Sequence, residues 1–161
     1  MQRILDKAAR VNESELESLY RRVFAYLLRL SGGNRSEAEE VAQETFVRIL
    51  RSQFELREAD RLVPWALRIA TNVRLDLLRR RPTSRLEGDV EATRTESSDE
   101  TPLAIRQVAE LPEPYKTVLS LRYFEDLDYD EIAQILDVPV GTLKSQVCRG
   151  LKMIRKKMEK P

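Results

Sequence analysis

Apolar residues recur at intervals of three and four through much of the chain, which predicts helices. The first stripe spans residues 15–30 and the second spans residues 38–50. Gly32 and Gly33 separate them and predict a stop, because glycine accepts the left-handed conformation that follows a helix end. We expect the second helix to begin at Ser36 with a capping box, since Glu39 stands three residues later. The expected inward residues are Leu16, Leu19, Tyr20, Val23, Phe24, Leu27 and Leu28 in the first helix, and Ala38, Val41, Ala42, Thr45, Phe46, Ile49 and Leu50 in the second.

A third helix is predicted from Pro64 to Arg81, with proline in the first turn, where its missing amide is tolerated. Its apolar residues repeat every four positions, and this spacing assigns Trp65 to the core. The polar stretch 51–61 is the candidate loop before it. The repeating residues are Trp65, Ile69, Val73 and Leu77.

Residues 82–101 differ from everything around them. The segment is rich in Ser, Thr and acid, has few large apolar residues and carries a net charge of −4. Such a segment cannot bury enough surface to offset its ordering entropy, so we predict a flexible acidic linker. Its acids are Glu87, Asp89, Glu91, Glu96, Asp99 and Glu100, against Arg85 and Arg94.

Four short helices are expected after the linker, at 103–110, 113–124, from Asp128 onward, and after the turn 137–139. Asp128 and Glu131 form a capping-box pair, and Ala133 stands where two helices must approach closely. Two short helices joined by a tight turn match the helix-turn-helix pattern. Expected inward residues are Tyr115, Val118 and Leu119, then Ile132, Ala133, Ile135 and Leu136, then Leu143, Val147, Leu151 and Ile154.

The predicted fold is therefore all-α, with two small helical domains at 1–81 and 102–161 joined by the flexible acidic linker 82–101. The chain has no histidine and one cysteine, Cys148. These counts disfavour a zinc site and exclude both a histidine-based triad and an intrachain disulfide. We expect no catalytic residue, metal or cofactor. No apolar run approaches the length of a membrane helix and no signal peptide is evident, so a cytoplasmic protein without membrane insertion is expected.

The net charge of +1 hides a segregation of charge along the chain. Residues 139–161 hold seven bases and one acid, a net of +6. A basic helix of this kind fits the DNA major groove, where Lys and Arg reach bases and phosphates. A solvated cationic helix end, favoured by the helix dipole, is the alternative. The residues expected to project from the last helix are Lys144, Ser145, Cys148, Arg149 and Lys152.

Three segments resemble one known family. The segment LPEPYKTVLSLRYFEDLDYDEIAQILDVPVGTLKSQVCRGLKMIRKKM resembles the DNA-binding region 4 of extracytoplasmic-function (ECF) sigma factors in the sigma-70 family. AEEVAQETFVRIL resembles the polymerase-binding helix of region 2, and PWALRIATNVRLDLLRRR resembles the helix that reads the melted upstream element. The resemblance covers nearly the whole chain in the family's order.

This resemblance implies a non-enzymatic alternative sigma factor that directs promoter recognition, promoter melting and transcription initiation. The implied partners are core RNA polymerase, through its β′ clamp and β flap, promoter DNA and an anti-sigma factor. Glu40, Gln43 and Glu44 match the family's clamp-contacting positions. Their spacings of three and four also place them on one helix face, which could equally be a solvated acidic surface.

The third helix carries the residues that match the family's surface for the −10 element. Asn72 matches an asparagine typical of the family, and an amide can pair with a base edge. Phe54, in the preceding loop, either stacks on an extruded base or plugs the core beneath the loop, and both interpretations stay open. The polar set of the helix is Arg68, Asn72, Asp76, Arg79 and Arg80.

The last helix carries the residues that match the family's −35 reading face: Lys144, Ser145, Cys148 and Arg149. Family members often have arginine at the positions of Lys144 and Gln146. Because lysine lacks arginine's planar fork, the preferred base is expected to differ there. Cys148, beside Arg149, is either a redox-sensitive thiol or a small filler, and the lack of a second thiol favours the filler.

Two other classes of protein share part of this pattern. A response regulator has a similar DNA-binding half, but it needs an α/β receiver domain where this chain predicts only helices. A helical adaptor without a DNA role would not need the segregated charge. An enzyme is the weakest alternative, because no nucleophile–base pair or glycine-rich phosphate loop is present.

Overall fold

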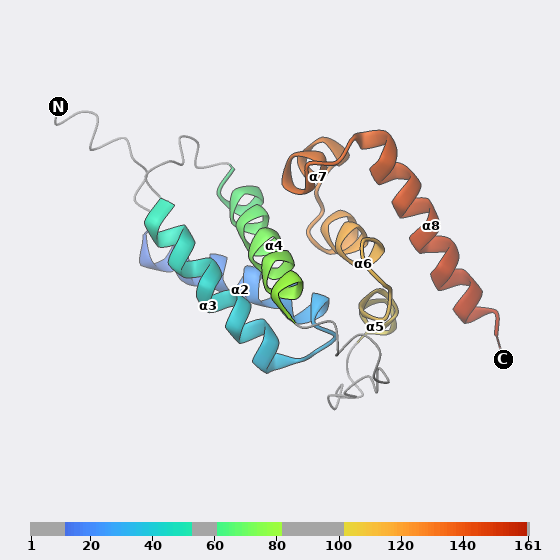
Figure 1. Cartoon of the computed structure of the whole chain (residues 1–161), viewed down its shortest axis with the longest axis horizontal. Helices are drawn as coiled ribbons and strands as arrows, with labels where there is room; N and C mark the ends of the chain where they lie inside the picture. Colours follow the sequence, from blue (N-terminus) through green and yellow to red (C-terminus); the bar gives the residue numbers. More distant parts are fainter. Residues whose placement is uncertain (1–11, 53–60, 82–101, 161) are drawn as a thin grey trace.

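The computed structural model describes residues 12–52, 61–81 and 102–160, and within these ranges every regular element is a helix (Figure 1). The all-α prediction is therefore confirmed for this part of the chain. Phe54 and the predicted linker 82–101 lie outside the described residues, so the predictions made for them stay predictions.

The N-terminal domain consists of α2 (Glu13–Leu30), α3 (Arg35–Ser52) and α4 (Leu62–Arg80), each of which packs against the other two. Helix α2 begins with a capping box that sequence analysis missed. The Glu15 amide donates to Asn12 Oδ1 at 2.8 Å, and the Asn12 amide donates to Glu15 Oε2 at 3.0 Å. Both amides would otherwise lack a partner at the helix start, so the pair fixes where α2 begins.

Helix α3 does not begin as predicted. It starts at Arg35, and the Glu37 amide donates to Asn34 Oδ1 at 3.1 Å, so Asn34 rather than Ser36 is the capping residue. The predicted stop is confirmed, because Gly32 and Gly33 both have positive φ, at 61° and 86°. Glycine adopts this region at little cost, and the turn there lets the helix begin after Asn34, two residues before Ser36.

The core of the N-terminal domain is centred on α4. Leu67, Ala70 and Val73 are fully buried, whereas Trp65 is half-buried and packs against the core from one side. The four-residue stripe therefore marks only one edge of a wider buried face, because α4 is covered by helices on more than one side. Two expected core residues are exposed, Tyr20 at 40% and Leu50 at 48%.

The C-terminal domain consists of α5 (Leu103–Ala109), α6 (Tyr115–Leu119), η4 (Ser120–Phe124), α7 (Tyr129–Leu136) and α8 (Val140–Met158). The single helix expected at 113–124 begins at Tyr115 and widens into a π-helical turn, η4. The Glu125 amide donates to the Ser120 carbonyl at 3.2 Å, five residues back. Such widened turns often occur at functional positions, and this one ends at Glu125.

Helices α7 and α8 form the predicted helix-turn-helix. The capping box of Asp128 and Glu131 is confirmed, and the turn uses Asp137 in a left-handed conformation at φ 53°. Gly150 marks a close approach of α8 to α6, because a Cβ there would lie 2.9 Å from Leu119 Cδ1. Ala133 is half-buried and packs against the core, and its role at a close helix contact stays a prediction. Leu151, expected inward, is 43% exposed because the inward line of α8 runs through Leu143, Val147 and Gly150.

The two domains are in contact. Helix α4 lies against α7, and α2 lies against η4 and α5 (Figure 1). Helix α8 lies at the far side of the C-terminal domain from α2 and α3. One candidate reading helix, α4, therefore lies at the centre of the molecule, and the other, α8, lies at its edge.

Candidate nucleic-acid interface

The predicted reading face of α8 is open to solvent. Lys144, Ser145, Cys148, Arg149 and Lys152 are all exposed, while Leu143 and Val147 on the opposite side are buried. At about 100° per residue, Arg155 and Lys156 continue this face toward the end of the helix, and both are exposed. We call the five predicted residues together with Arg155 and Lys156 the α8 face. It presents a strip of positive charge of the kind that duplex phosphates attract.

Two residues of the α8 face have defined local contacts. Lys144 Nζ lies 5.6 Å from the centroid of the Tyr129 ring, and the Arg122 guanidinium lies 5.0 Å from the same centroid. The Ser145 hydroxyl donates to the Gly141 carbonyl at 3.2 Å. Ser145 therefore offers a ligand its acceptor lone pairs, and Tyr129 restrains Lys144 through a cation–π contact.

The polar residues predicted on α4 divide into two kinds. Arg68, Asn72, Arg79 and Arg80 are exposed, as a nucleic-acid surface requires. Asp76 is half-buried and forms ion pairs at 3.7 Å with Arg48 and with Arg79. A carboxylate repels phosphate, so Asp76 is better suited to holding these two arginines than to touching a nucleic-acid backbone.

The predicted polymerase-binding residues lie at a groove between α3 and α4. Glu40, Gln43 and Glu44 are exposed and line a groove of ≈390 Å³, whose other wall includes Asp76 and Arg80. Glu44 pairs with Arg48 at 3.0 Å, and Glu40 lies 3.9 Å from Arg81. The structure therefore brings the predicted polymerase surface and the C-terminal half of the α4 surface to one place, which their sequence separation did not suggest.

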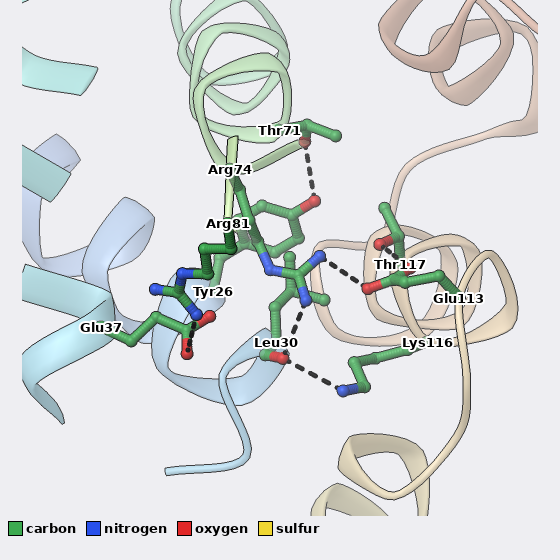
Figure 2. Close-up of polar contacts among 9 residues, drawn as sticks. All are labelled: Tyr26, Leu30, Glu37, Thr71, Arg74, Arg81, Glu113, Lys116 and Thr117. Atoms are coloured by element: carbon green, nitrogen blue, oxygen red, sulfur yellow. Dashed lines mark hydrogen bonds and ion pairs between the residues drawn. The ribbon is translucent and has the colours of Figure 1, made fainter. Parts of the chain in front are cut away.

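Sequence analysis missed a set of charged contacts between the domains. Arg74 is 6% exposed; its Nη1 lies 2.6 Å from Glu113 Oε1 and its Nη2 donates to the Leu30 carbonyl at 3.3 Å (Figure 2). Lys116 Nζ donates to the same carbonyl at 3.2 Å. Leu30 is the last residue of α2, so its carbonyl has no partner within the helix and attracts cations. The sequence offered one sign of this contact, because Arg74 lies on the apolar side of α4, one turn after Ala70 and Thr71.

A second group of contacts joins the domains at Glu125, whose side chain is 3% exposed. Arg22 Nε donates to Glu125 Oε2 at 2.8 Å, and Arg29 Nη2 donates to the other carboxylate oxygen. The Arg29 guanidinium also lies 5.1 Å from the centroid of the Phe124 ring. We call the contacts of Arg22, Arg29, Arg74 and the Leu30 carbonyl with Glu113, Lys116 and Glu125 the interdomain seam.

Two groups near the seam, the half-buried Lys116 and the fully buried Tyr26, have shifted pKa values. Burial lowers the pKa of Lys116, although the neighbouring Glu113 opposes that change. Burial also raises the pKa of Tyr26, whose hydroxyl lies 2.8 Å from Thr71 Oγ1 (Figure 2). Because the Thr71 hydroxyl donates to the Leu67 carbonyl at 2.7 Å, Tyr26 is the donor to Thr71.

No group of three or more His, Cys, Asp or Glu side chains suited to a metal ion occurs in residues 12–52, 61–81 and 102–160. Among the helices of the same ranges, none has the length and apolar character needed to cross a membrane.

Comparison with known families and proteins identifies the chain. The family model "Sigma-70 region 2" matches residues 16–83, and "Sigma-70, region 4" matches residues 103–154. The ECF RNA polymerase sigma factor SigW of Bacillus subtilis is 33% identical over 147 residues, covering 78% of each chain. The chain belongs to the ECF group of the sigma-70 family. Sigma factors are transcription initiation factors without enzymatic activity. This family assignment excludes the response-regulator, adaptor and enzyme alternatives.

Other similar proteins agree with this assignment. The RNA polymerase sigma-H factor of Pseudomonas aeruginosa is 34% identical over 142 residues, which cover 76% of this chain and 74% of that protein. Among solved structures, the sigma factor RpoE of Bartonella quintana, in complex with the anti-sigma factor NepR, has a TM-score of 0.77 and 19% identity over 92% of this chain and 96% of its own. CnrH, in complex with the cytosolic domain of CnrY, has a TM-score of 0.65 and 22% identity over 97% of this chain and 95% of its own.

Proposed function

We propose that this ECF sigma factor binds core RNA polymerase with its N-terminal domain and reads promoter DNA with α4 and α8. The observation that carries the proposal is the α8 face, a solvent-exposed basic strip on the second helix of a helix-turn-helix. A helix in this position enters the major groove, where side chains such as Arg149 pair with base edges. We assign the −35 element to Lys144, Ser145, Cys148, Arg149 and Lys152.

The upstream −10 element is assigned to the exposed polar residues of α4. Arg68, Asn72, Arg79 and Arg80 supply charges for a single-stranded backbone and an amide for a base. Asp76 acts within this surface by holding Arg48 and Arg79. Phe54 belongs to the same proposal from the sequence alone, as the candidate stacking residue.

Polymerase binding is assigned to Glu40, Gln43 and Glu44, which the family resemblance aligns with the β′ clamp contact. Their exposure at the edge of a groove supports this role. We further propose contact between the C-terminal domain and the β flap, control by an anti-sigma factor, and action in the cytoplasm. The known complexes of RpoE with NepR and of CnrH with CnrY support anti-sigma control. The domain limits 1–81, 82–101 and 102–161 belong to the proposal. The family matches support the two inner limits, since one match ends at residue 83 and the other begins at residue 103.

The test is a pull-down of purified core RNA polymerase with the full chain, followed by run-off transcription on fragments of bacterial genomic DNA. The double variant E40R/E44R should lose core binding by tenfold or more, since each change places a like charge where the partner is expected to be basic. Glu17, 64% exposed on α2, provides the control E17R, which should bind core like the unchanged chain. Equal binding by all three proteins would overturn the assignment of the α3 surface, and no binding by any would overturn the proposed function.

A further inference from the structure

One tyrosine at the start of α7 lies beside two cations that come from different helical elements. The Arg122 guanidinium of η4 lies over the Tyr129 ring at 5.0 Å from its centroid, and the Lys144 ammonium of α8 lies over the same ring at 5.6 Å. The face of an aromatic ring is negative, so it attracts both cations although they repel each other. The ring therefore links η4 and α7 to the second turn of α8.

The position of the Tyr129 ring is fixed by its surroundings. Tyr129 is the first residue of α7, and the capping box there holds the start of the helix with two hydrogen bonds of 2.8 and 2.9 Å. On the η4 side, Arg122 Nη1 donates to the Leu127 carbonyl at 2.9 Å. Tyr129 is half-buried, whereas Lys144 is exposed. The contact therefore restricts mainly the long Lys144 side chain, which has the most conformational freedom to lose.

This restriction concerns a residue of the α8 face that has little direction of its own. A lysine ammonium is a point charge on a flexible stem, and it lacks the planar fork with which arginine selects a base edge. In the part of the chain that the structure describes, Lys152 of the same face lies over no aromatic ring. Lys144 is thus a lysine whose surroundings supply a direction, and Lys152 is the natural comparison.

We propose that Tyr129 is a positioning residue for Lys144, and that the base preference contributed by Lys144 depends on the Tyr129 ring. This inference rests on the proposed assignment of α8 to the −35 element. The ring limits the ammonium to few conformations before DNA binds, so less entropy is lost when Lys144 meets a base edge and one direction of approach is favoured. Without the ring, Lys144 keeps its charge and still attracts phosphates. Loss of the ring therefore reduces discrimination between bases more than it reduces attraction to duplex DNA.

The first experiment tests the contact in the free full-length chain by NMR of the lysine ε-methylene groups. Protons over the face of an aromatic ring resonate upfield, so the ε-protons of Lys144 should lie upfield of those of Lys152. K144R identifies the Lys144 signal by removing it. Y129L should abolish the upfield shift, and Y129F should retain it because phenylalanine keeps the ring. An unshifted Lys144 signal, or a shift that survives in Y129L, would overturn the proposal.

The second experiment measures base preference with the holoenzyme, assembled from core RNA polymerase and the full chain. Duplexes with a randomised segment of about 10 base pairs are selected by binding and then sequenced. K144A identifies the base pair whose preference depends on Lys144, where discrimination should fall about tenfold. Y129L should lose about threefold at the same base pair, and Y129F almost nothing. The double variant K144A/Y129L should match K144A there, because Tyr129 acts through Lys144.

Tyr123 provides the matched control, since it is a 56% exposed tyrosine of η4. Y123L should leave the preference at that base pair unchanged. Circular dichroism and thermal unfolding check that each variant is folded. If Y129L disturbs folding, Y129M gives the same comparison, because methionine fills the site without an aromatic face.

The outcomes separate this inference from the proposed function. A holoenzyme of the unchanged chain that selects no common duplex sequence would overturn both the −35 assignment and the role of Tyr129. A selected sequence whose preferences are the same in Y129L and the unchanged chain would overturn the role of Tyr129 alone. So would an equal loss at every base pair in Y129L, because a purely structural role of the ring predicts that result.

Discussion

Helices α4 and α8 have the same length, 19 residues, and are both proposed to read DNA, but they differ in their surroundings. Helix α4 has buried residues on more than one side, contacts α2, α3 and α7, and contains a buried arginine. Helix α8 buries Leu143, Val147 and Gly150 along one line and exposes most of its remaining residues. On α8 the residues proposed to contact DNA are therefore different from those that pack against the core. On α4 the two kinds of residue lie close together, so a substitution in one affects the other.

The difference has a chemical consequence. The α8 face has neighbours only on its own domain, so its charge is available to duplex DNA whatever the position of the N-terminal domain. The polar residues of α4 are shared between a groove with α3 and a groove with α7. Their availability depends on how the neighbouring helices are placed. We therefore expect variants of the α8 face to change DNA binding alone, and many α4 variants to change stability and binding together.

The largest expected effect comes from comparing one leucine of each helix. Leu67 in α4 is fully buried and Leu151 in α8 is 43% exposed. L67A should lower the free energy of unfolding by about 2–5 kcal/mol, because it leaves a cavity in the core. L151A should change it by less than about 0.5 kcal/mol. Urea denaturation followed by circular dichroism measures both, and similar losses would show that the helices do not differ as described.

The next effect concerns glycines in α8. Gly150 packs against Leu119 and Tyr115, whereas a Cβ at Gly141 would meet nothing within 4 Å. G150V should destabilise the chain by about 1–3 kcal/mol through overpacking. G141A should stabilise it by up to about 1 kcal/mol, because alanine is the better helix former. Thermal unfolding of the two variants distinguishes this from an α8 that is exposed on all sides, for which both would be stabilising.

A third test separates reading from packing on α8. R149A should weaken binding to a target promoter by about 1–3 kcal/mol if Arg149 pairs with a base. Lys157 is the matched control, because it lies off the α8 face and pairs with Glu110. K157A should bind DNA nearly as well as the unchanged chain. Gel-shift assays with the polymerase holoenzyme measure binding, and both variants should unfold within about 0.5 kcal/mol of the unchanged chain.

A smaller effect is expected from single hydroxyl groups. Tyr26 donates to Thr71 on α4 in a fully buried place, and Ser145 donates to Gly141 on the exposed face of α8. Y26F should cost about 1 kcal/mol of unfolding free energy, since it removes a buried hydrogen bond and leaves Thr71 one donor short. S145A should cost less than about 0.5 kcal/mol, because water replaces its bond. Equal costs, measured by urea denaturation, would contradict the difference in burial.

The smallest effect is the pH dependence contributed by Lys116, which contacts the end of α2 near α4. Because burial lowers the pKa of Lys116, the unfolded chain binds more protons than the folded chain between that lowered value and the ordinary 10.5. Stability from this group therefore rises with pH through that window, and the penalty is fully present below it. K116M should lose this rise, and K152M, which removes an exposed amine from α8, should retain it. Urea denaturation at several alkaline pH values measures the change.

Much of the fold follows from local patterns. The apolar spacing placed the main helices, and the Asp128 capping box was correctly predicted because a cap involves residues three apart. The α8 face was also predictable, since residues three and four apart lie on the same side of a helix. The errors were local too. Asn34 rather than Ser36 caps α3, because the helix begins directly after the turn at Gly33. Leu151 is exposed because its neighbour Gly150 is the residue of α8 that faces Leu119.

The sequence by itself determined which segments are helical, where charge of one sign accumulates and, through its resemblance, the family. Only the tertiary structure decided which charges meet. Arg74 and Glu113 are 39 residues apart, and Arg22 and Glu125 are 103 apart. No helical period relates such positions, because their partners are set by how the domains pack. Charged residues that usually lie on a protein surface are brought together by this packing in the interdomain seam. The seam lies beside α4 and does not include α8.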